Sequence, residues 1–212
     1  MTRPPKKIDA VWSRTERKLL DRLASPYAIQ EYLDQLAYSI DSFYRSPRQV
    51  MRDRAAHCLD GALFAAAALR RLGHPPLLVD LRANRDDDHL LAIFRRDGLF
   101  GAVAKSNFVT LRYREPVYRS LRELVMSYFE GFFNVAGDRS LREYSRPFAL
   151  DRFDHLNWMT DNACLDAIAV RLDASRHYPV APPKAIAALH KMDARSYQAA
   201  MLGVREEGLY RP

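Results

Sequence analysis

The stretch from residue 59 to residue 69 constrains the fold of this chain more than any other. It reads LDGALFAAAAL and is apolar at nearly every position, and Gly73 and Pro75-Pro76 follow it closely. Glycine favours the left-handed conformation that ends many helices, and proline cannot continue a helix, so the pattern predicts a helix that stops just before Gly73. A helix that is apolar all round is a buried one. We therefore expect the other elements to pack around it.

Three short apolar runs follow the central helix and predict strands. They cover residues 77–81, 89–94 and 99–104. Asp97 and Gly98 stand between the last two runs, and this dipeptide favours a tight hairpin because both residues tolerate a positive φ. We expect those two strands to be antiparallel neighbours. The fold class is then α+β, with a long central helix packed on a small antiparallel sheet.

Further elements are expected on both sides of this segment. A serine followed by a proline is typical of a helix start, since serine caps the helix and proline suits its first position. The expected elements are helices that begin at Ser25-Pro26 and Ser46-Pro47, a helix over 117–129, a strand over 144–150, a helix over 160–172 capped by Thr160, and short helices within 182–192 and 195–204. Residues 1–22 are polar and basic and are expected to form a loosely attached N-terminal arm. Residues 23–212 are expected to form one domain with a helical C-terminal extension.

Composition limits the classes of function. No apolar run approaches the roughly 20 residues that cross a bilayer, and the first residues lack the apolar core of a secretory signal. The net charge is +7, but acidic and basic residues are interspersed, so no nucleic-acid partner is expected. The two cysteines offer no disulfide framework, and the 8 scattered glycines offer no phosphate loop. We expect a cytoplasmic protein without a cofactor or a membrane partner; its oligomeric state stays open.

Cys58 and His89 are the candidate chemical groups. Cys58 stands at the expected start of the central helix, where free N–H groups and the helix dipole favour a thiolate. His89 opens an apolar strand directly after three aspartates, at the edge of the expected core, where it could serve as a general base. Asp60 works against a thiolate, because a carboxylate in the same first turn competes for the N–H groups and raises the thiol pKa.

Two stretches within residues 54–107 resemble a bacterial branch of the transglutaminase-like superfamily. They read HCLDGALFAAAALRRLGHPPLLVDL and DDDHLLAIFRRDGLFGAVAKSN. The order of a cysteine on a long helix, a strand and a histidine that opens a hairpin carries the resemblance. It implies a papain-type fold and acyl transfer, with Cys58 as nucleophile and His89 as general base. The substrate would be a peptide, an amide or an ester.

The third catalytic residue differs from the family pattern. Where that family carries its orienting aspartate, this chain has Ala104. A two-residue turn at Asp97-Gly98 sets His89 opposite Ser106, whereas a three-residue loop sets it opposite Asn107. Papain-like enzymes orient their imidazole with asparagine, so Asn107 is the first choice and Ser106 the reserve.

Alternative interpretations stay open beside the catalytic one. One alternative is that the catalytic site is degenerate and that the protein serves as a binding or scaffolding module. A mixed metal site that uses His57, Cys58, His89 and an aspartate lacks paired ligand spacing, so no metal is expected. Cys164 lies on the apolar side of a predicted helix and is expected to belong to the core. Hydrolysis, transamidation and proteolysis share one acyl-enzyme stage and are not separated.

Overall fold

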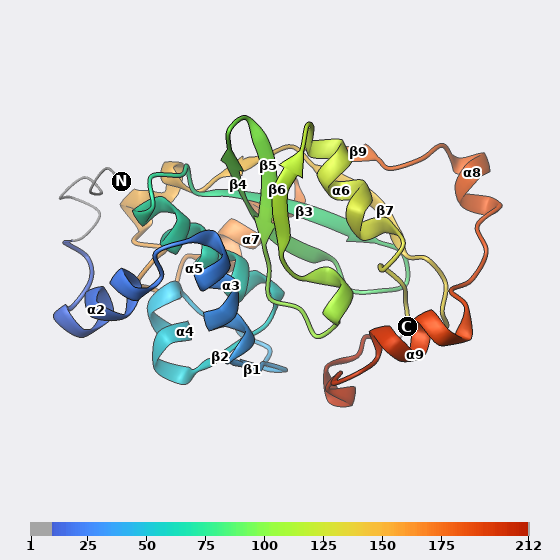
Figure 1. Cartoon of the computed structure of the whole chain (residues 1–212). Coiled ribbons are helices and arrows are strands. Elements are labelled where there is room, and N and C mark those ends of the chain that lie inside the picture. Colours follow the sequence, from blue (N-terminus) through green and yellow to red (C-terminus); the bar gives the residue numbers. More distant parts are fainter. Residues whose placement is uncertain (1–9, 212) are drawn as a thin grey trace.

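The apolar stretch forms the helix α5 (Cys58–Arg71) in a computed structural model that describes residues 10–211. Figure 1 shows the elements around it. The helices before it are α2 (Arg14–Arg22), α3 (Pro26–Asp34) and α4 (Pro47–Asp53), and the later ones are α6 (Leu121–Phe129), α7 (Leu165–Asp173), α8 (Pro183–Ala187) and α9 (Ala194–Ala200). Three 3₁₀ turns are η1 (Val109–Leu111), η2 (Asp151–Leu156) and η3 (Glu206–Gly208). Every residue of α5 from Leu59 to Leu69 is buried, as expected.

An antiparallel sheet packs beside α5. Its strands are β3 (Leu77–Ala83), β4 (His89–Arg96), β5 (Leu99–Val103), β6 (Arg114–Tyr118), β7 (Leu141–Ser145), β8 (Phe148–Ala149) and β9 (His177–Pro179). They lie in the order β6-β5-β4-β3-β7-β9, and β8 also pairs with β3. A separate parallel pair joins β1 (Ala37–Tyr38) to β2 (Ala55–Ala56). The expected α+β class with an antiparallel sheet is confirmed.

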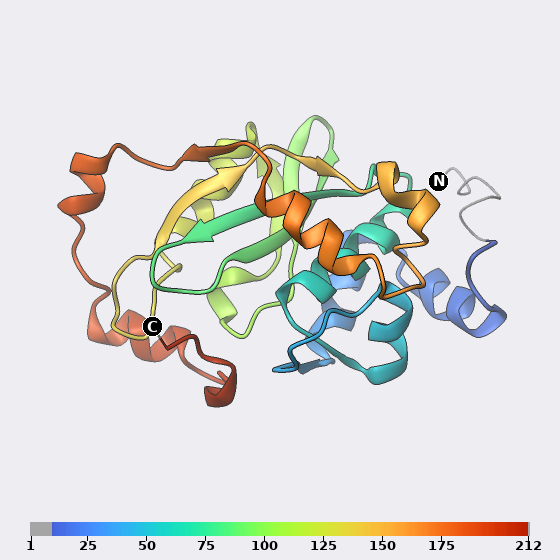
Figure 2. The same ribbon diagram turned by 180° about the vertical axis from the view of Figure 1, so that it is seen from behind.

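The sheet separates two apolar clusters. Leu78, Leu90 and Ala92 belong to the cluster that contains α5, and α7 packs into the same cluster. Leu81 and Leu91, which alternate with them, belong to the cluster that contains α6. Figure 2 shows α5 and α7 on one face of the sheet, and Figure 1 shows α6 on the other. Alternation along β3 and β4 therefore decides which layer each side chain enters.

The hairpin and the Ser-Pro helices match the sequence predictions. Ser25 and Ser46 cap α3 and α4, and each side chain accepts a hydrogen bond from a backbone N–H three residues later. Arg96 pairs with Leu99 across a two-residue turn, in which Asp97 and Gly98 both have positive φ. The two-residue alternative for the hairpin is therefore the one that the structure adopts.

Three predicted boundaries are wrong. Residues 114–118 form the strand β6, and the helix α6 starts only after Ser120, whose side chain caps it. The predicted strand over 144–150 is divided into β7 and β8, and β7 already begins at Leu141. The helix expected from Thr160 is α7, which begins at Leu165. Hydrogen bonds set two of these boundaries: Ser120 caps α6, and the Thr160 and Asp161 N–H groups donate to the Asn157 carbonyl oxygen in a turn before α7.

The N-terminal arm is partly integrated into the core. Residues 1–9 lie outside the described residues, but Ser13 caps α2 in a reciprocal capping box with Glu16. Trp12 and Leu20 are buried in the cluster that contains α5. Residues 12–22 are thus a docked helix rather than a loose arm. Within residues 10–211, none of the helices has the length and apolarity that a membrane crossing requires.

Candidate functional site

Cys58 is the first residue of α5, where His57 and Asp60 hold the helix start. The His57 Nδ1 atom accepts a hydrogen bond from the Leu59 N–H at 3.1 Å. The Asp60 carboxylate accepts from the His57 N–H at 3.3 Å and from the Arg45 N–H at 2.7 Å. Asp60 is fully buried, and the Arg45 guanidinium lies 3.7 Å from it. The helix start is thus fixed by buried polar contacts, as a precise site requires.

The surroundings of Cys58 keep its thiol protonated. Burial raises the pKa of this thiol to about 12, and the charges of Asp87 and Asp60 act in the same direction. The Sγ atom lies 3.8 Å from the Asp88 carbonyl oxygen, to which it can donate. Asp60 therefore acts on the thiol in the direction that the sequence indicates.

His89 opens β4 and is held by a backbone carbonyl. Its Nε2 atom lies 2.7 Å from the Leu111 carbonyl oxygen, and its ring meets Phe132 edge-on. Because a carbonyl only accepts, Nε2 carries the hydrogen and Nδ1 keeps its lone pair. Burial and the positive charge of Arg114 lower the pKa of His89 to about 4, although the hydrogen bond to Leu111 acts in the opposite direction. The imidazole is therefore neutral and its free lone pair is on Nδ1.

Cys58 and His89 come from opposite faces of the sheet. Cys58 packs against the cluster around α5, whereas His89 alternates with Leu90 and contacts Leu111 and Phe132 in the other cluster. The residue of β4 that faces α5 is therefore Leu90. Successive side chains of a strand point to opposite faces of the sheet. Because Leu90 faces α5, this alternation places His89 on the face away from α5.

The two side chains nevertheless line the same small cavity, at the end of the sheet where β4 begins. The cavity measures about 30 Å³ and is also lined by Ser106, Leu111 and Phe132. This volume is enough for one water molecule. No hydrogen bond joins Cys58 to His89 in the described chain, since the Cys58 thiol is directed to Asp88 and the His89 Nε2 to Leu111. The structure thus brings the two candidates to one cavity without pairing them.

Asn107 and Ser106 are engaged elsewhere. The Asn107 amide group donates to the Arg205 carbonyl and accepts from the Arg205 N–H, both at 2.9 Å. The Ser106 hydroxyl accepts from the Phe108 N–H at 3.0 Å. The β4–β5 ladder ends at the pair Ala92–Val103, so neither residue lies in a strand opposite His89. The contact that orients the imidazole is the Leu111 carbonyl, which no side-chain pattern could indicate.

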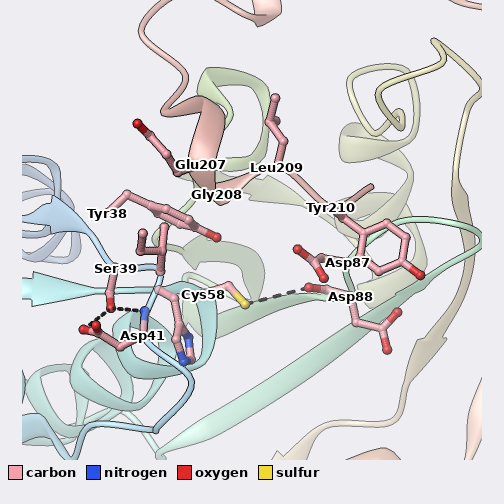
Figure 3. A pocket seen from close by; sticks show the side chains of 12 residues that line it. Tyr38, Ser39, Asp41, Cys58, Asp87, Asp88, Glu207, Gly208, Leu209 and Tyr210 are labelled. Carbon is pink, nitrogen blue, oxygen red and sulfur yellow. Dashed lines mark hydrogen bonds between the residues drawn. The ribbon is translucent and has the colours of Figure 1, made fainter. Parts of the chain in front are cut away.

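A larger pocket adjoins the small cavity and is also lined by Cys58. It measures about 330 Å³, and its walls include Tyr38, His57 and Asp87. Residues 207–210 form a further wall, although they lie far along the chain from α5. Figure 3 shows Gly208, Leu209 and Tyr210 along this pocket, with Cys58 directed toward Asp88.

Sequence reasoning missed a second group of titratable residues. Asp80 is buried in β3, and its Oδ2 lies 3.0 Å from His177 Nε2. Burial and the charge of Asp88 raise the pKa of Asp80 to about 6. An aspartate inside the apolar run LLVDL was the available signal, because a buried carboxyl needs a partner.

Within residues 10–211, Asp80, Asp88 and Asp173 lie close enough together to hold a metal ion. Their carboxylate oxygens lie within 4.8 Å of one another and line a pocket of about 230 Å³ that also reaches Cys58. Arg82 donates to Asp173 at 2.6 Å and His177 contacts Asp80. The Arg82 guanidinium therefore offsets part of the negative charge of the three carboxylates.

Comparisons with known proteins give a partial likeness. Neither a family model nor a curated protein matches the sequence. Solved structures similar to the chain include two of LapG from Legionella pneumophila, one of them EGTA-treated. Each has 17% sequence identity and a TM-score of 0.34, and covers 48% of this chain and 67% of LapG. A likeness of this size does not assign the chain to a family.

Proposed function

We propose that this chain is a transglutaminase-like cysteine enzyme that transfers an acyl group from a peptide, an amide or an ester. Cys58 is the nucleophile and His89 the general base. The Leu111 carbonyl holds the imidazole, in the role that the sequence analysis gave to Asn107. The observation that carries the proposal is the single cavity lined by a cysteine at a helix start and by a histidine whose Nε2 is already fixed.

The chemistry follows from the tautomer of His89. Its Nδ1 lone pair takes the thiol proton as the sulfur attacks the carbonyl carbon, and the imidazolium then returns the proton to the leaving amine or alcohol. The bond between the carbonyl carbon and the leaving group breaks, and a thioester remains on Cys58. Water or a second amine then attacks the thioester in the same way. The N–H of Cys58, in the first turn of α5, would donate to the oxyanion.

The reaction requires a change at the thiol. Cys58 has to turn from the Asp88 carbonyl to the His89 ring, since the two are not hydrogen-bonded in the described structure. Catalytic hydrogen bonds often form only when substrate is bound. A substrate that separates Asp87 from the thiol would also lower the thiol pKa, because the charge of Asp87 raises it.

The test is to trap the acyl-enzyme. The protein is incubated with an activated aryl ester, and the acyl adduct is located by peptide mass spectrometry. We expect an adduct on Cys58 that is absent in Cys58→Ser and reduced by about a hundredfold in His89→Ala, as for a lost general base. Cys164 in the same samples reports non-specific acylation. Equal acylation of both cysteines would contradict the proposal.

A second candidate function is a binding module with a degenerate site. The observation that favours it is the ring of carboxylates around the thiol, because Asp87, Asp60 and Asp80 all raise the pKa of Cys58. A thiol in such surroundings is inert unless something neutralises them. This candidate predicts that Cys58→Ser and His89→Ala change no activity and that a partner binds both variants normally.

A further inference from the structure

The segment 205–210 lies against the candidate site and is held there by its backbone. Asn107 both donates to and accepts from the main chain of Arg205. Such a double contact recognises a peptide unit whatever its side chain is, as neighbouring strands do. The Arg205 guanidinium also donates to the Tyr38 carbonyl at 2.9 Å. The segment is therefore fixed at its first residue by polar contacts of residues 38 and 107.

Three residues further on, the segment fits glycine closely. The Gly208 N–H donates to the Arg205 carbonyl at 3.1 Å, so the chain turns through η3. A Cβ added at Gly208 would lie 3.0 Å from the Tyr38 ring and 3.2 Å from the Asn107 amide nitrogen. Contacts this short force a neighbour to move. The site thus has a main-chain clamp at one position and a close fit to glycine at another.

The segment then passes the thiol. Gly208 and Tyr210 line both the small cavity and the large pocket, and Cys58 lines both as well. Tyr38 belongs to the same two walls. Figure 3 shows the segment from Gly208 to Tyr210 running past Tyr38, Cys58 and Asp87. A peptide in the place of this segment would pass directly beside Cys58.

We propose that Tyr38, Asn107 and the surface beside Cys58 form a peptide-binding groove, which the chain's own segment 205–210 occupies in this structure. The groove takes a short turned peptide with glycine three residues after the clamped residue. This inference rests on the proposed function, since it identifies the acyl substrate of that reaction as a glycine-containing peptide. It also implies that the segment must leave before a substrate binds.

The experiment uses the full-length chain with the segment released. The double variant Arg205→Pro/Gly208→Val removes the N–H that donates to Asn107 and adds a Cβ that collides with Tyr38. Backbone amide exchange over 205–210 reports the release. A fluorescent peptide with the sequence of residues 203–211 is then titrated and followed by anisotropy. The matched control adds Asn107→Ala to the double variant.

We expect the peptide to bind the double variant at least about tenfold more tightly than the wild-type chain, whose groove is already filled. The affinity for the peptide should fall by about tenfold with Asn107→Ala. It should fall equally when the peptide carries valine at the position of Gly208. Bound peptide should also slow iodoacetamide labelling of Cys58. Failure of the segment to exchange faster in the double variant, or equal binding to wild type and double variant, would overturn the groove.

Anisotropy needs no reactive thiol, so the two proposals fail separately. Peptide binding without acylation of Cys58 would refute the enzyme and keep the groove. Acylation of Cys58 without peptide binding would refute the groove and keep the enzyme.

Discussion

The two walls around Cys58 are built in different ways. One wall consists of α5 and β4, and its backbone is held by the two apolar clusters of the core. The other wall is the segment 205–210, held mainly by contacts of Asn107 and Tyr38 that span 98 and 167 residues of sequence. Segments with few buried contacts open at a much smaller free-energy cost than core elements. We therefore distinguish a fixed wall, on which the proposed chemistry would take place, from a removable wall, which would control access to it.

A glycine-to-valine change on each wall should separate them most strongly. A Cβ at Gly61 would lie 2.2 Å from the Lys105 Cβ, and Lys105 cannot retreat because its buried Nζ donates to the Leu33 and Leu36 carbonyls. We expect Gly61→Val to lower the free energy of unfolding by about 3 kcal/mol. Gly208→Val should lower it by less than about 1 kcal/mol, because the segment that it loosens has few buried contacts. Urea denaturation measures both, and equal losses would remove the distinction.

The second expected effect is the acid sensitivity of the fixed wall. The pKa of His89 is depressed from 6.5 to about 4 by burial, so its contribution to stability is present above pH 6.5 and lost as the pH falls through about 4. The wild-type chain should therefore lose free energy of unfolding as the pH falls from 6.5 to about 4. We expect this loss to be smaller in His89→Gln by on the order of 2 kcal/mol. His190→Gln, at an exposed position, is the control for the loss of a histidine. Identical pH profiles for wild type and His89→Gln would show that the imidazole is not buried in solution.

A smaller effect concerns the charge beside the thiol. Asp87 is exposed and raises the pKa of Cys58, so Asp87→Asn should lower that pKa and leave the fold intact. We expect iodoacetamide to label Cys58 about threefold faster near pH 8, because the thiolate fraction rises. The same change at Asp97, in the hairpin turn at the other end of β4, should have no effect. An unchanged rate for Asp87→Asn would mean that the thiol does not sense the charge of Asp87.

Asn107→Ala should have the smallest effect, and its sign matters. If Asn107 oriented the imidazole, as the sequence suggested, its removal would slow the labelling of Cys58. In the structure Asn107 binds the backbone of Arg205. Removal of the Asn107 side chain should therefore loosen the segment 205–210 and make the labelling of Cys58 about twofold faster. Ser106→Ala serves as the control, because Ser106 bonds to Phe108 and not to the segment. Slower labelling would restore the role that the sequence assigned to Asn107.

The sequence predicted the fixed wall far better than the removable one. The apolar run of α5 and the Asp97-Gly98 turn are local patterns, and local patterns set the helix, the hairpin and the position of Cys58. The contacts of His89 with the Leu111 carbonyl and of Asn107 with Arg205 depend on backbone groups brought from elsewhere in the chain. Backbone atoms are the same at every residue, so no side-chain pattern identifies such partners.

In our proposal, Cys58 and His89 form a working pair once the segment 205–210 is displaced. The measurement that decides this is the pH dependence of iodoacetamide labelling at Cys58 in the double variant Arg205→Pro/Gly208→Val, with and without His89→Ala, and with Cys164 as internal control. We expect fast labelling of Cys58 below about pH 7 in the double variant and its loss with His89→Ala. Labelling that follows an ordinary thiol with a pKa near 8.5 or higher, unchanged by His89→Ala, would refute the pair.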